Sequence, residues 1–402
     1  MSCGISVYID NIHVIKRASL LSPNRKNAKF FKNGLNASKD CFGHGTPIVN
    51  YTDVYNKRSL KREDIKGLVS LSDADIKRFE VRKGDVFFTR TSETPEEVGL
   101  TSVLLEDIEN CVFSGFILRA RPFKNVKISL DYFAYCFTTK QVRTSIIQGC
   151  SCTTRALTNG RLLSEVKFAL PPTTTEQTNI ATALNDIDDL IQDLQALIAK
   201  KQDIKTGTMQ QLLSEKMRIK GYVNKWISVN MGKTCRPQKG SQLNKNDMLE
   251  EGFYPVMNGG VSPSGYHSEY NTEANTIIIS EGGNSCGFIN YIHSRFWAGG
   301  HCYVLSPDLE LFDLDFLYYI LKFNEPLIMG LRTGSGLPNV KKSALNDLMF
   351  TIPDTIAEQR AIARVLSDMD SEIELLTAQL EKYKFLRDGM MQQLLTGKIR
   401  LI

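Results

Sequence analysis

The chain has 402 residues, 42% of them hydrophobic and 23% charged, which is ordinary for a globular protein and predicts two or three domains. It contains no run of about 18 uncharged apolar residues, and its first ten residues lack the pattern of a secretory signal, so a cytoplasmic location is expected. Nine cysteines without a CxxC pair indicate reduced thiols and no metal site.

Residues 1–170 are expected to form a first globular domain. Residues 1–172 carry 26 Lys and Arg against 17 Asp and Glu, as a phosphate-binding surface would. Runs of β-branched and aromatic residues predict strands at 86–89, 111–113 and 116–118, followed by a helical patch around 130–147.

A polar loop, Thr89 to Glu93, directly follows the first of these strands. Such a loop can present side chains to base edges and backbone N–H groups to phosphates, although an ordinary turn has the same composition. The candidate DNA-binding residues of this domain are Arg90, Thr91, Ser92 and Arg155. Arg155 follows Thr153 and Thr154 in a turn that either contacts the DNA backbone or is a flexible lead-in to the next helix.

Residues 171–218 are expected to form a first long helix that acts as a spacer and docking element. Its apolar residues recur in alternating steps of four and three, which is the spacing of a heptad seam. The predicted seam residues are Ile180, Leu184, Ile187, Ile191, Leu194 and Ile198. Thr173 and Glu176 match the capping box, a pattern that satisfies the first backbone N–H groups of a helix.

Residues 219–352 are expected to form a second globular domain with strands at 276–279 and 302–305 and a helical patch at 314–329. Residues 219–354 carry 11 Lys and Arg against 13 Asp and Glu, so this domain is less basic than the first. The polar loop Ser280 to Ser285 corresponds to the loop at Thr89, and it lacks the GK[ST] ending of a nucleotide-binding loop.

The candidate DNA-binding residues of the second domain are Lys233, Arg236, Ser280, Gly283, Asn284, Arg295, Trp297 and His301. Trp297 and His301 flank two glycines, and a packing role in the core or a loop is the alternative for both.

Residues 353–402 are expected to form a second long helix of the spacer and docking type. Its seam residues are Ile362, Leu366, Met369, Ile373, Leu376, Leu380 and Tyr383, and Thr355 with Glu358 repeats the capping-box pattern. Residues 170–219 align without a gap to residues 352–401 at an offset of 182, including Met209-Gln210-Gln211-Leu212-Leu213 and Met391-Gln392-Gln393-Leu394-Leu395.

The order of the elements predicts how the two helices pair. The first helix leads from the first domain to the second, and the second helix must run back if it pairs with the first. The expected fold is therefore α+β, with two globular domains separated by two long helices in an antiparallel coiled coil, and with an internal two-fold repeat. The alternative is that each helix packs only on its own domain.

No catalytic motif is present. The chain has no Asn/Asp-Pro-Pro-Tyr/Phe run of an amino-methyltransferase, no Walker A motif of a motor, and no histidine in a metalloprotease or triad context. A non-catalytic protein without a cofactor of its own is expected.

The whole chain resembles the specificity subunits of type I restriction–modification enzymes. The resemblance rests on Gly84 to Arg90, Pro171-Pro172 with Glu176-Gln177-x-x-Ile180-Ala181, Gly334 to Asn339, Ile352-Pro353, Glu358-Gln359-x-x-Ile362-Ala363 and Gln392 to Lys398. It departs from the family at its start, because Trp226-Ile227 opens the second domain and no such tryptophan opens the first.

The resemblance implies that two target-recognition domains each read one half of a bipartite double-stranded DNA sequence. It implies as partners two adenine methyltransferase subunits and the restriction/translocase subunits, to which S-adenosylmethionine, ATP and Mg would belong. It also implies that the helices set the spacing of the half-sites.

Two other functions remain open from the sequence: a stand-alone DNA-binding regulator and a coiled-coil scaffold. A subunit that docks methyltransferases should expose apolar residues outside the seam, and Leu190, Leu197 and Leu375 are the candidates.

Overall fold

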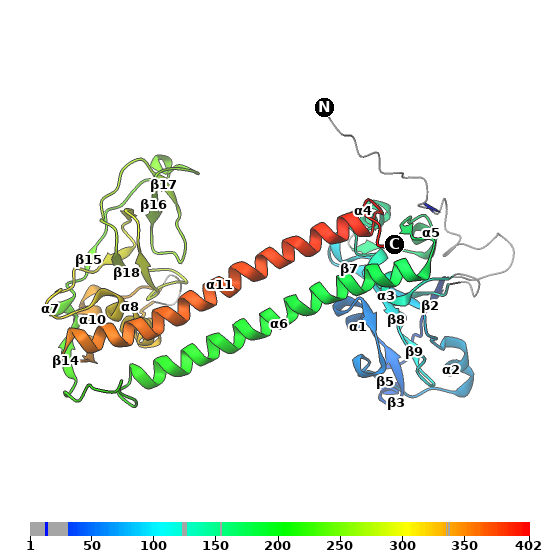
Figure 1. Ribbon diagram of the computed structural model, residues 1–402, viewed down its shortest axis with the longest axis horizontal. Helices are drawn as coiled ribbons and strands as arrows, with labels where there is room; N and C mark the ends of the chain where they lie inside the picture. The colour runs from blue at the N-terminus through cyan, green and yellow to red at the C-terminus, as the bar shows by residue number, and fades with distance from the viewer. Residues whose placement is uncertain (1–12, 15–30, 123–126, 153–154, 335, 337) are drawn as a thin grey trace. The chain divides into compact units, whose positions relative to one another are not determined.

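The computed structural model describes residues 13–14, 31–122, 127–152, 155–334, 336 and 338–402, and it divides into two compact units (Figure 1). The first unit comprises Met1–Asp193 and Leu380–Ile402, and the second comprises Leu194–Gln379. Each unit contains a globular α+β domain, the beginning of one long helix and the end of the other. Over the described ranges, no helix is both long and apolar enough to cross a membrane.

The first domain is built on a five-stranded sheet whose central strands are covered on both faces. The strand order is β2 (Phe31–Asn33), β10 (Ile117–Ala120), β6 (Val86–Thr89), β8 (Thr101–Leu104) and β4 (Ser59–Leu60). Every residue of β6 and β10 is buried. Phe88 packs in one hydrophobic cluster and Phe87 in another, which explains why the run reads as continuously apolar.

Smaller elements complete the first domain. Its other sheets are β5 (Leu68–Val69), β3 (Phe42–Val49) and β9 (Val112–Phe113); β11 (Ser151–Cys152), β12 (Ala156–Leu157) and β7 (Thr91–Ser92); and β1 (His13–Val14) with β13 (Ala169–Leu170). Its helices are α1 (Tyr51–Asn56), α2 (Asp73–Phe79), α3 (Leu130–Cys136), α4 (Lys140–Gly149) and α5 (Gly160–Leu163), with 3-10 turns η1 (Lys39–Cys41), η2 (Arg62–Asp64) and η3 (Pro95–Glu97).

The second domain has a four-stranded main sheet. Its order is β15 (Gln238–Lys239), β21 (Cys302–Val304), β18 (Thr276–Ser280) and β19 (Ile289–Ile292). The other sheets are β17 (Gly265–His267), β16 (Tyr254–Met257) and β20 (Trp297–Ala298), and β14 (Ile227–Asn230) with β22 (Met349–Ile352). The helices are α7 (Met231–Thr234), α8 (Leu314–Phe323), α9 (Glu325–Gly330) and α10 (Lys342–Asn346), with the 3-10 turn η4 (Lys245–Asp247).

The two domains use the same strand frame. The order β2-β10-β6-β8 corresponds to β15-β21-β18-β19. Strand β3 pairs antiparallel with β5 and parallel with β9, and β16 likewise pairs antiparallel with β17 and parallel with β20. A final antiparallel pair, β1–β13 or β14–β22, leads into each long helix. The first domain therefore opens as the second does, although it lacks the tryptophan of the second.

The long helices are α6 (Thr174–Leu212) and α11 (Ile356–Leu394), each of 39 residues. All predicted seam residues are buried or half-buried. Ile180 and Leu184 at the start of α6 belong to the core of the first domain, and so do Leu394 and Leu395 at the end of α11. The corresponding residues of the other unit, including Leu366, share the core of the second domain with Leu212 and Leu213. The alternative that each helix packs only on its own domain is therefore wrong.

Ion pairs between the helices fix their direction in each unit. In the second unit, Lys201 lies 2.7 Å from Glu372, and Lys205 pairs with Asp370. In the first unit, Arg387 lies 3.8 Å from Asp188. As the residue number along α6 rises, the number of its ion-pair partner in α11 falls. This order confirms the antiparallel arrangement.

One buried glutamine near the start of each long helix connects that helix to its domain. The Gln177 side chain accepts a hydrogen bond from the Ser129 N–H at 2.8 Å and donates to the Pro171 carbonyl at 2.9 Å. Gln359 accepts from the Asp313 N–H at 2.9 Å and donates to the Pro353 carbonyl at 3.1 Å. Ser129 and Asp313 are the N-cap residues of α3 and α8. Gln177 therefore connects the start of α6 to the start of α3, and Gln359 connects the start of α11 to the start of α8.

The capping-box prediction is only half right. The Thr173 and Thr355 hydroxyls accept from the Glu176 and Glu358 N–H groups, as the pattern requires. The glutamates do not bond back to the threonine N–H groups. Glu176 instead forms a two-bond ion pair with Arg400, and Glu358 forms one with Arg218 at 2.7 and 2.8 Å. Both glutamates are buried, so a distant arginine supplies the charge that each carboxylate needs there.

Candidate DNA interface

The predicted loop after β6 is a strand connection held on both sides. The Arg90 N–H donates to the Phe116 carbonyl at 3.3 Å, and the Arg90 carbonyl accepts from the Thr158 N–H at 3.0 Å. Thr91 and Ser92 form β7, which pairs with β12. The backbone is thus fixed while the Arg90 side chain is exposed, which is the geometry of a preorganised contact.

A groove of about 580 Å³ lies beside this connection. It is lined by Tyr51, Thr52, Tyr55, Asn56, Thr91, Ser92, Glu93, Glu97, Phe116 and Arg155. It brings three of the four candidates of the first domain together, and Arg90 lies next to Thr91 in the chain. Phe116 is 70% exposed, and Arg155 lies 2.9 Å from the exposed Glu93.

The Ser92 side chain is bonded inside the first domain. It is buried, and its hydroxyl donates to the Glu97 carboxylate at 2.6 Å. Tyr55 donates to the same carboxylate at 2.8 Å, and these two hydrogen bonds lower the pKa of Glu97. The Ser92 hydroxyl is therefore held within the domain by Glu97, and its contact with DNA stays a prediction.

The second domain repeats the connection with different side chains. The Glu281 N–H donates to the His301 carbonyl, and the Val340 N–H donates to the Glu281 carbonyl, both at 2.8 Å. Ser280 is buried and its hydroxyl bonds to the Gly259 carbonyl, so its side chain, like that of Ser92, is held within the domain. Gly283 has a φ of 76°, a conformation that favours glycine, and Asn284 beside it is exposed.

A charged cluster surrounds Glu281, which the sequence prediction omitted. Its carboxylate lies 2.9 Å from the Lys239 ammonium, accepts from the Tyr303 hydroxyl at 3.0 Å and lies 3.7 Å from His301 Nδ1. Burial, followed by the bond to Glu281, raises the pKa of Tyr303 to about 12. The side chains of Lys239 and His301 are more than half exposed, whereas that of Glu281 is 13% exposed. Glu281 therefore orients two surface donors.

The remaining candidates of the second domain are dispersed. Trp297 is half-buried and its indole N–H donates to the Ser241 carbonyl at 3.0 Å, so the packing role fits it. Arg295 pairs with Glu273 at 2.9 Å and lies over the Tyr270 ring. Lys233 and Arg236 are exposed on and just after α7.

Comparison with known proteins identifies the family. Residues 224–383 match the family described as "Type I restriction modification DNA specificity domain". A putative type I specificity subunit of Mycoplasma pneumoniae is 36% identical over 172 residues, which are 42% of this chain and 46% of the relative. Residues 224–383 are therefore similar to the DNA specificity domain of type I restriction–modification systems.

Other members extend the likeness along the chain. A putative specificity subunit of the type I restriction enzyme MjaX from Methanocaldococcus jannaschii is 24% identical over 416 residues, covering 92% of this chain and 91% of the relative. The matches to the specificity subunits of Mycoplasma pneumoniae and Mycoplasma genitalium span about half the length of those relatives, 46% of each.

A solved structure has the same fold. The crystal structure of a type I restriction–modification S subunit from M. genitalium aligns over 96% of this chain and 97% of its own, with a TM-score of 0.64 at 18% identity. The chain therefore shares with that structure the fold of two domains and two long helices.

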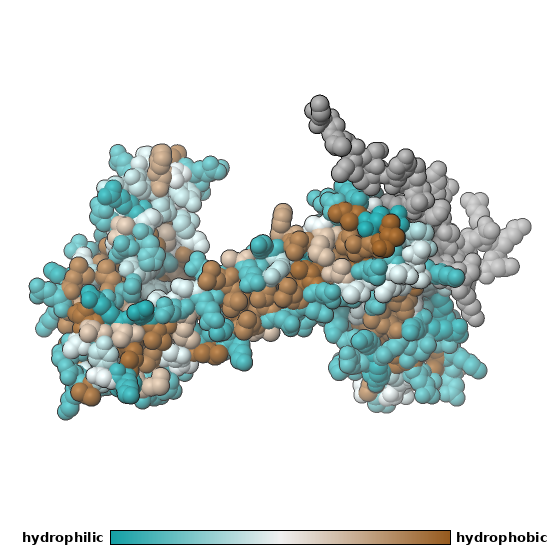
Figure 2. All heavy atoms as spheres, viewed as in Figure 1, coloured by the Kyte–Doolittle hydropathy of each residue, from teal (hydrophilic) through white to brown (hydrophobic). Residues whose placement is uncertain are grey.

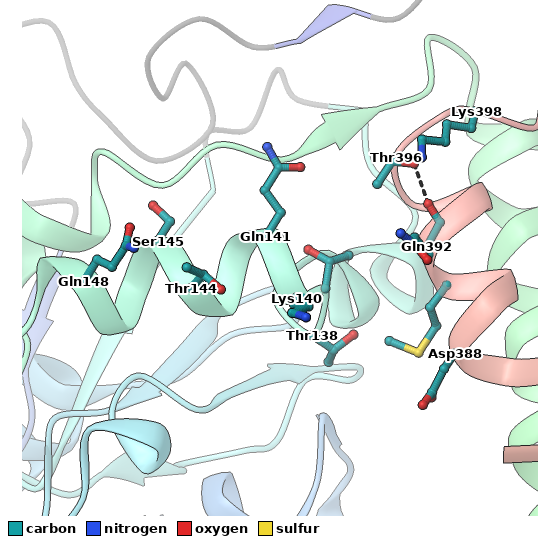
Figure 3. A pocket seen from close by; sticks show the side chains of 12 residues that line it. Thr138, Lys140, Gln141, Thr144, Ser145, Gln148, Asp388, Gln392, Thr396 and Lys398 are labelled. Atoms are coloured by element: carbon teal, nitrogen blue, oxygen red, sulfur yellow. Dashed lines mark hydrogen bonds between the residues drawn. The ribbon is translucent and has the colours of Figure 1, made fainter. Parts of the chain in front are cut away.

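Two further surfaces were not among the predicted DNA-binding residues. Figure 3 shows polar side chains of α4, among them Gln141, Ser145 and Gln148, which line a groove of about 1020 Å³ together with Gln392 and Lys398 from the C-terminal end of the chain. Figure 2 shows apolar side chains along both long helices. Within the described ranges, no group of three His, Cys, Asp or Glu residues is placed to hold a metal ion.

Proposed function

We propose that this protein is the non-catalytic subunit that recognises a bipartite double-stranded DNA sequence. It directs adenine methylation and ATP-dependent cleavage by partner methyltransferase and restriction/translocase subunits. The observation that carries the proposal is one strand frame used twice, with different side chains at matching connections. Such an arrangement suits a protein that reads two different half-sites with the same backbone.

The exposed basic side chains at the two connections support contact with DNA. Arg90 and Arg155 in the first domain, and Lys239 and His301 in the second, are exposed, and hydrogen bonds fix the backbone at Arg90 and His301. The ion pair between Arg155 and Glu93 is exposed, so exchanging the carboxylate for a phosphate loses little energy. The mild basic excess of the first domain adds long-range attraction to DNA.

The faces of the long helices outside the seam support docking of methyltransferases. Leu375 is 72% exposed, Leu190 and Leu197 are each 38% exposed, and Phe385 is 83% exposed. Apolar side chains of this kind on a helix favour contact with another protein. In this proposal the partner subunits bind S-adenosylmethionine, ATP and Mg.

A map of methylated adenines in the host genome, with and without this gene, tests the function. We expect a split motif that is methylated in the wild type and loses methylation in the deletion strain. Wild-type cells in which no split motif depends on the gene would contradict the proposal. Sequence-specific DNA binding by the isolated chain, in the absence of any co-purifying methyltransferase, would then favour the stand-alone regulator.

Leu375→Asp tests docking separately. We expect this variant to fold normally and to lose binding to the methyltransferase subunit in a co-purification, because the substitution places a charge in an apolar contact. Ser371→Asp, which adds the same charge at an exposed position of α11, is the matched control and should bind normally. Normal binding by both variants would contradict the assignment of this face.

A further inference from the structure

Three positions in the first domain have counterparts in the second that the strand registers define. Arg90 follows Thr89, which pairs with Ile117, and Glu281 follows Ser280, which pairs with Cys302. Phe116 precedes Ile117 and His301 precedes Cys302. In both domains the N–H of the first position donates to the carbonyl of the second. Arg90 therefore matches Glu281, and Phe116 matches His301.

The third position lies at the end of the neighbouring strand. Asn33 at the end of β2 pairs with Leu118, and Lys239 at the end of β15 pairs with Tyr303. Leu118 and Tyr303 are themselves matched, because each follows directly on Ile117 or Cys302. Asn33 therefore matches Lys239, and both are exposed.

A glycine follows the third position in both domains and lets the chain approach closely. A Cβ on Gly34 would lie 2.1 Å from the Ser114 carbonyl oxygen, and a Cβ on Gly240 would lie 2.3 Å from that of Gly299. Ser114 and Gly299 each stand two residues before the second position. The strand end is thus held against the turn that carries Phe116 or His301, and only glycine fits there.

Side-chain contacts in the second domain join the three positions into one patch. The Lys239 ammonium lies 2.9 Å from Glu281, and His301 Nδ1 lies 3.7 Å from the same carboxylate. Because the registers match, Asn33, Arg90 and Phe116 occupy the corresponding patch of the first domain. Both patches sit on fixed backbone, and their exposed side chains are free to meet a ligand.

We propose that Asn33, Arg90 and Phe116 form the base-reading patch of the first domain, and that Lys239, Glu281 and His301 form that of the second. This inference rests on the proposed function and adds to it which positions choose the bases. Arginine and lysine donate to guanine O6 and N7, asparagine pairs with adenine, and an aromatic ring contacts the thymine methyl group. The two patches differ at all three positions, so they select different bases.

Glu281 acts here as a positioning residue. Its side chain is 13% exposed and its oxygens are occupied by Lys239, Tyr303 and His301, so it fixes donors instead of meeting a base. Arg90 at the matched position is exposed and points its own donors outward. The second domain therefore presents hydrogen-bond donors to the DNA. Its half-site should contain a guanine at the base pair that Lys239 or His301 contacts.

The test uses the complete methyltransferase complex reconstituted with variant chains. We compare Arg90→Ala, Lys239→Ala and Glu281→Gln, with Arg161→Ala and Lys245→Ala as controls at exposed basic residues of the same domains. The readouts are the methylated motif and the affinity for duplexes in which one half-site is randomised.

We expect Arg90→Ala to relax one base position in one half-site only, and Lys239→Ala to relax one position in the other half-site only. The preference for the correct base should fall by about 5-fold to 100-fold. Glu281→Gln should relax the same position as Lys239→Ala by a smaller factor, which a purely structural role would not do. Retained reading of the untouched half-site shows that each variant is folded.

Unchanged base preferences would overturn the assignment of the base-reading patches. An equal loss of affinity for all sequences, as in the controls, would overturn it as well. That result leaves the proposed function intact as long as the wild-type complex methylates a split motif. A wild-type complex without a split motif overturns the proposed function and the patch together.

Discussion

The two recognition domains can be compared strand by strand, and they agree in their backbone far more than in their sequence. Four strands of each main sheet follow the same order, one smaller sheet in each domain combines an antiparallel and a parallel pair, and both domains end on a strand pair that enters a long helix. At the matched connection, however, one domain carries Arg90 and the other carries Glu281. Hydrogen-bond register and buried residues maintain the frame, so the exposed positions are free to differ.

The helix junctions show the opposite behaviour. Glu176 and Arg400 in the first unit correspond to Glu358 and Arg218 in the second, and the glutamines that follow make the same bonds in both. The glutamates, the glutamines and the arginines of this junction are each repeated at the offset of 182. Buried polar groups constrain their neighbours because an unpaired partner is costly, whereas exposed loop residues have no such constraint.

Breaking the junction ion pair should give the largest effect. Arg218→Met leaves the Glu358 carboxylate buried without a partner, and the free energy of unfolding should fall by about 3–5 kcal/mol. Arg400→Met should act equally on the first unit. Both tryptophans lie in the second unit, so urea unfolding followed by tryptophan fluorescence reports Arg218→Met, and circular dichroism reports both. Unequal losses in the two units would contradict the equivalence of the junctions.

Cavities in the helix seam should have the next largest effect. Leu184 and Leu366 are fully buried at matched positions, and Leu366→Ala or Leu184→Ala should each cost about 3 kcal/mol of unfolding free energy. Ile373 is only half-buried, so Ile373→Ala should cost less. Thermal unfolding of the three variants measures the order, and a cost for Ile373→Ala above that of the two leucine variants would be inconsistent with the burial along the seam.

Removal of the buried glutamine amides should cost somewhat less. Gln359→Ala leaves the Asp313 N–H and the Pro353 carbonyl without their partner, which should lower the unfolding free energy by about 2 kcal/mol. Gln177→Ala should lower it by a similar amount. Amide hydrogen exchange at residues 129 and 313 provides the check, since it should speed up at the start of α3 in one variant and of α8 in the other.

The exposed arginines should have the smallest effect on the fold. Arg155 and Arg295 each pair with an exposed glutamate at 2.9 Å, and replacing either with alanine should leave the melting temperature unchanged. If both contact phosphates, each variant should weaken DNA binding evenly across sequences and reduce the salt slope by about 1. A change of base preference in either variant would show that the arginine contacts a base and not a phosphate.

The sequence predicted the periodic and duplicated parts of the molecule best. Periodicity placed the seam residues of both long helices correctly. Strand composition placed the strand at 86–89 and the polar connection that follows it. The glutamates were misassigned to capping boxes because their partners lie 140 and 224 residues away in the chain. Arg218 and Arg400 share the offset of 182, and this coincidence was the available signal for the ion pairs.

The candidate site was harder to predict because exposure depends on tertiary packing. Ser92 and Ser280 have suitable side chains but are turned inward, whereas Phe116 was placed in the predicted strand 116–118 and is a 70% exposed residue just before β10. Lys239 and Glu281 come together through strand pairing between β15 and β21. The pairing of these strands cannot be predicted from the local composition of the sequence.

The composition of the two units has a consequence for how the protein folds during synthesis. The second unit is one continuous stretch, Leu194–Gln379, whereas the first also needs Leu380–Ile402. Leu394, Leu395 and Arg400 complete the core and the junction of the first unit, so a growing chain can finish the second unit before the first. The domain that leaves the ribosome first is therefore the last to reach its final form, and its surface around Ile180 and Leu184 stays uncovered until residues 380–402 emerge.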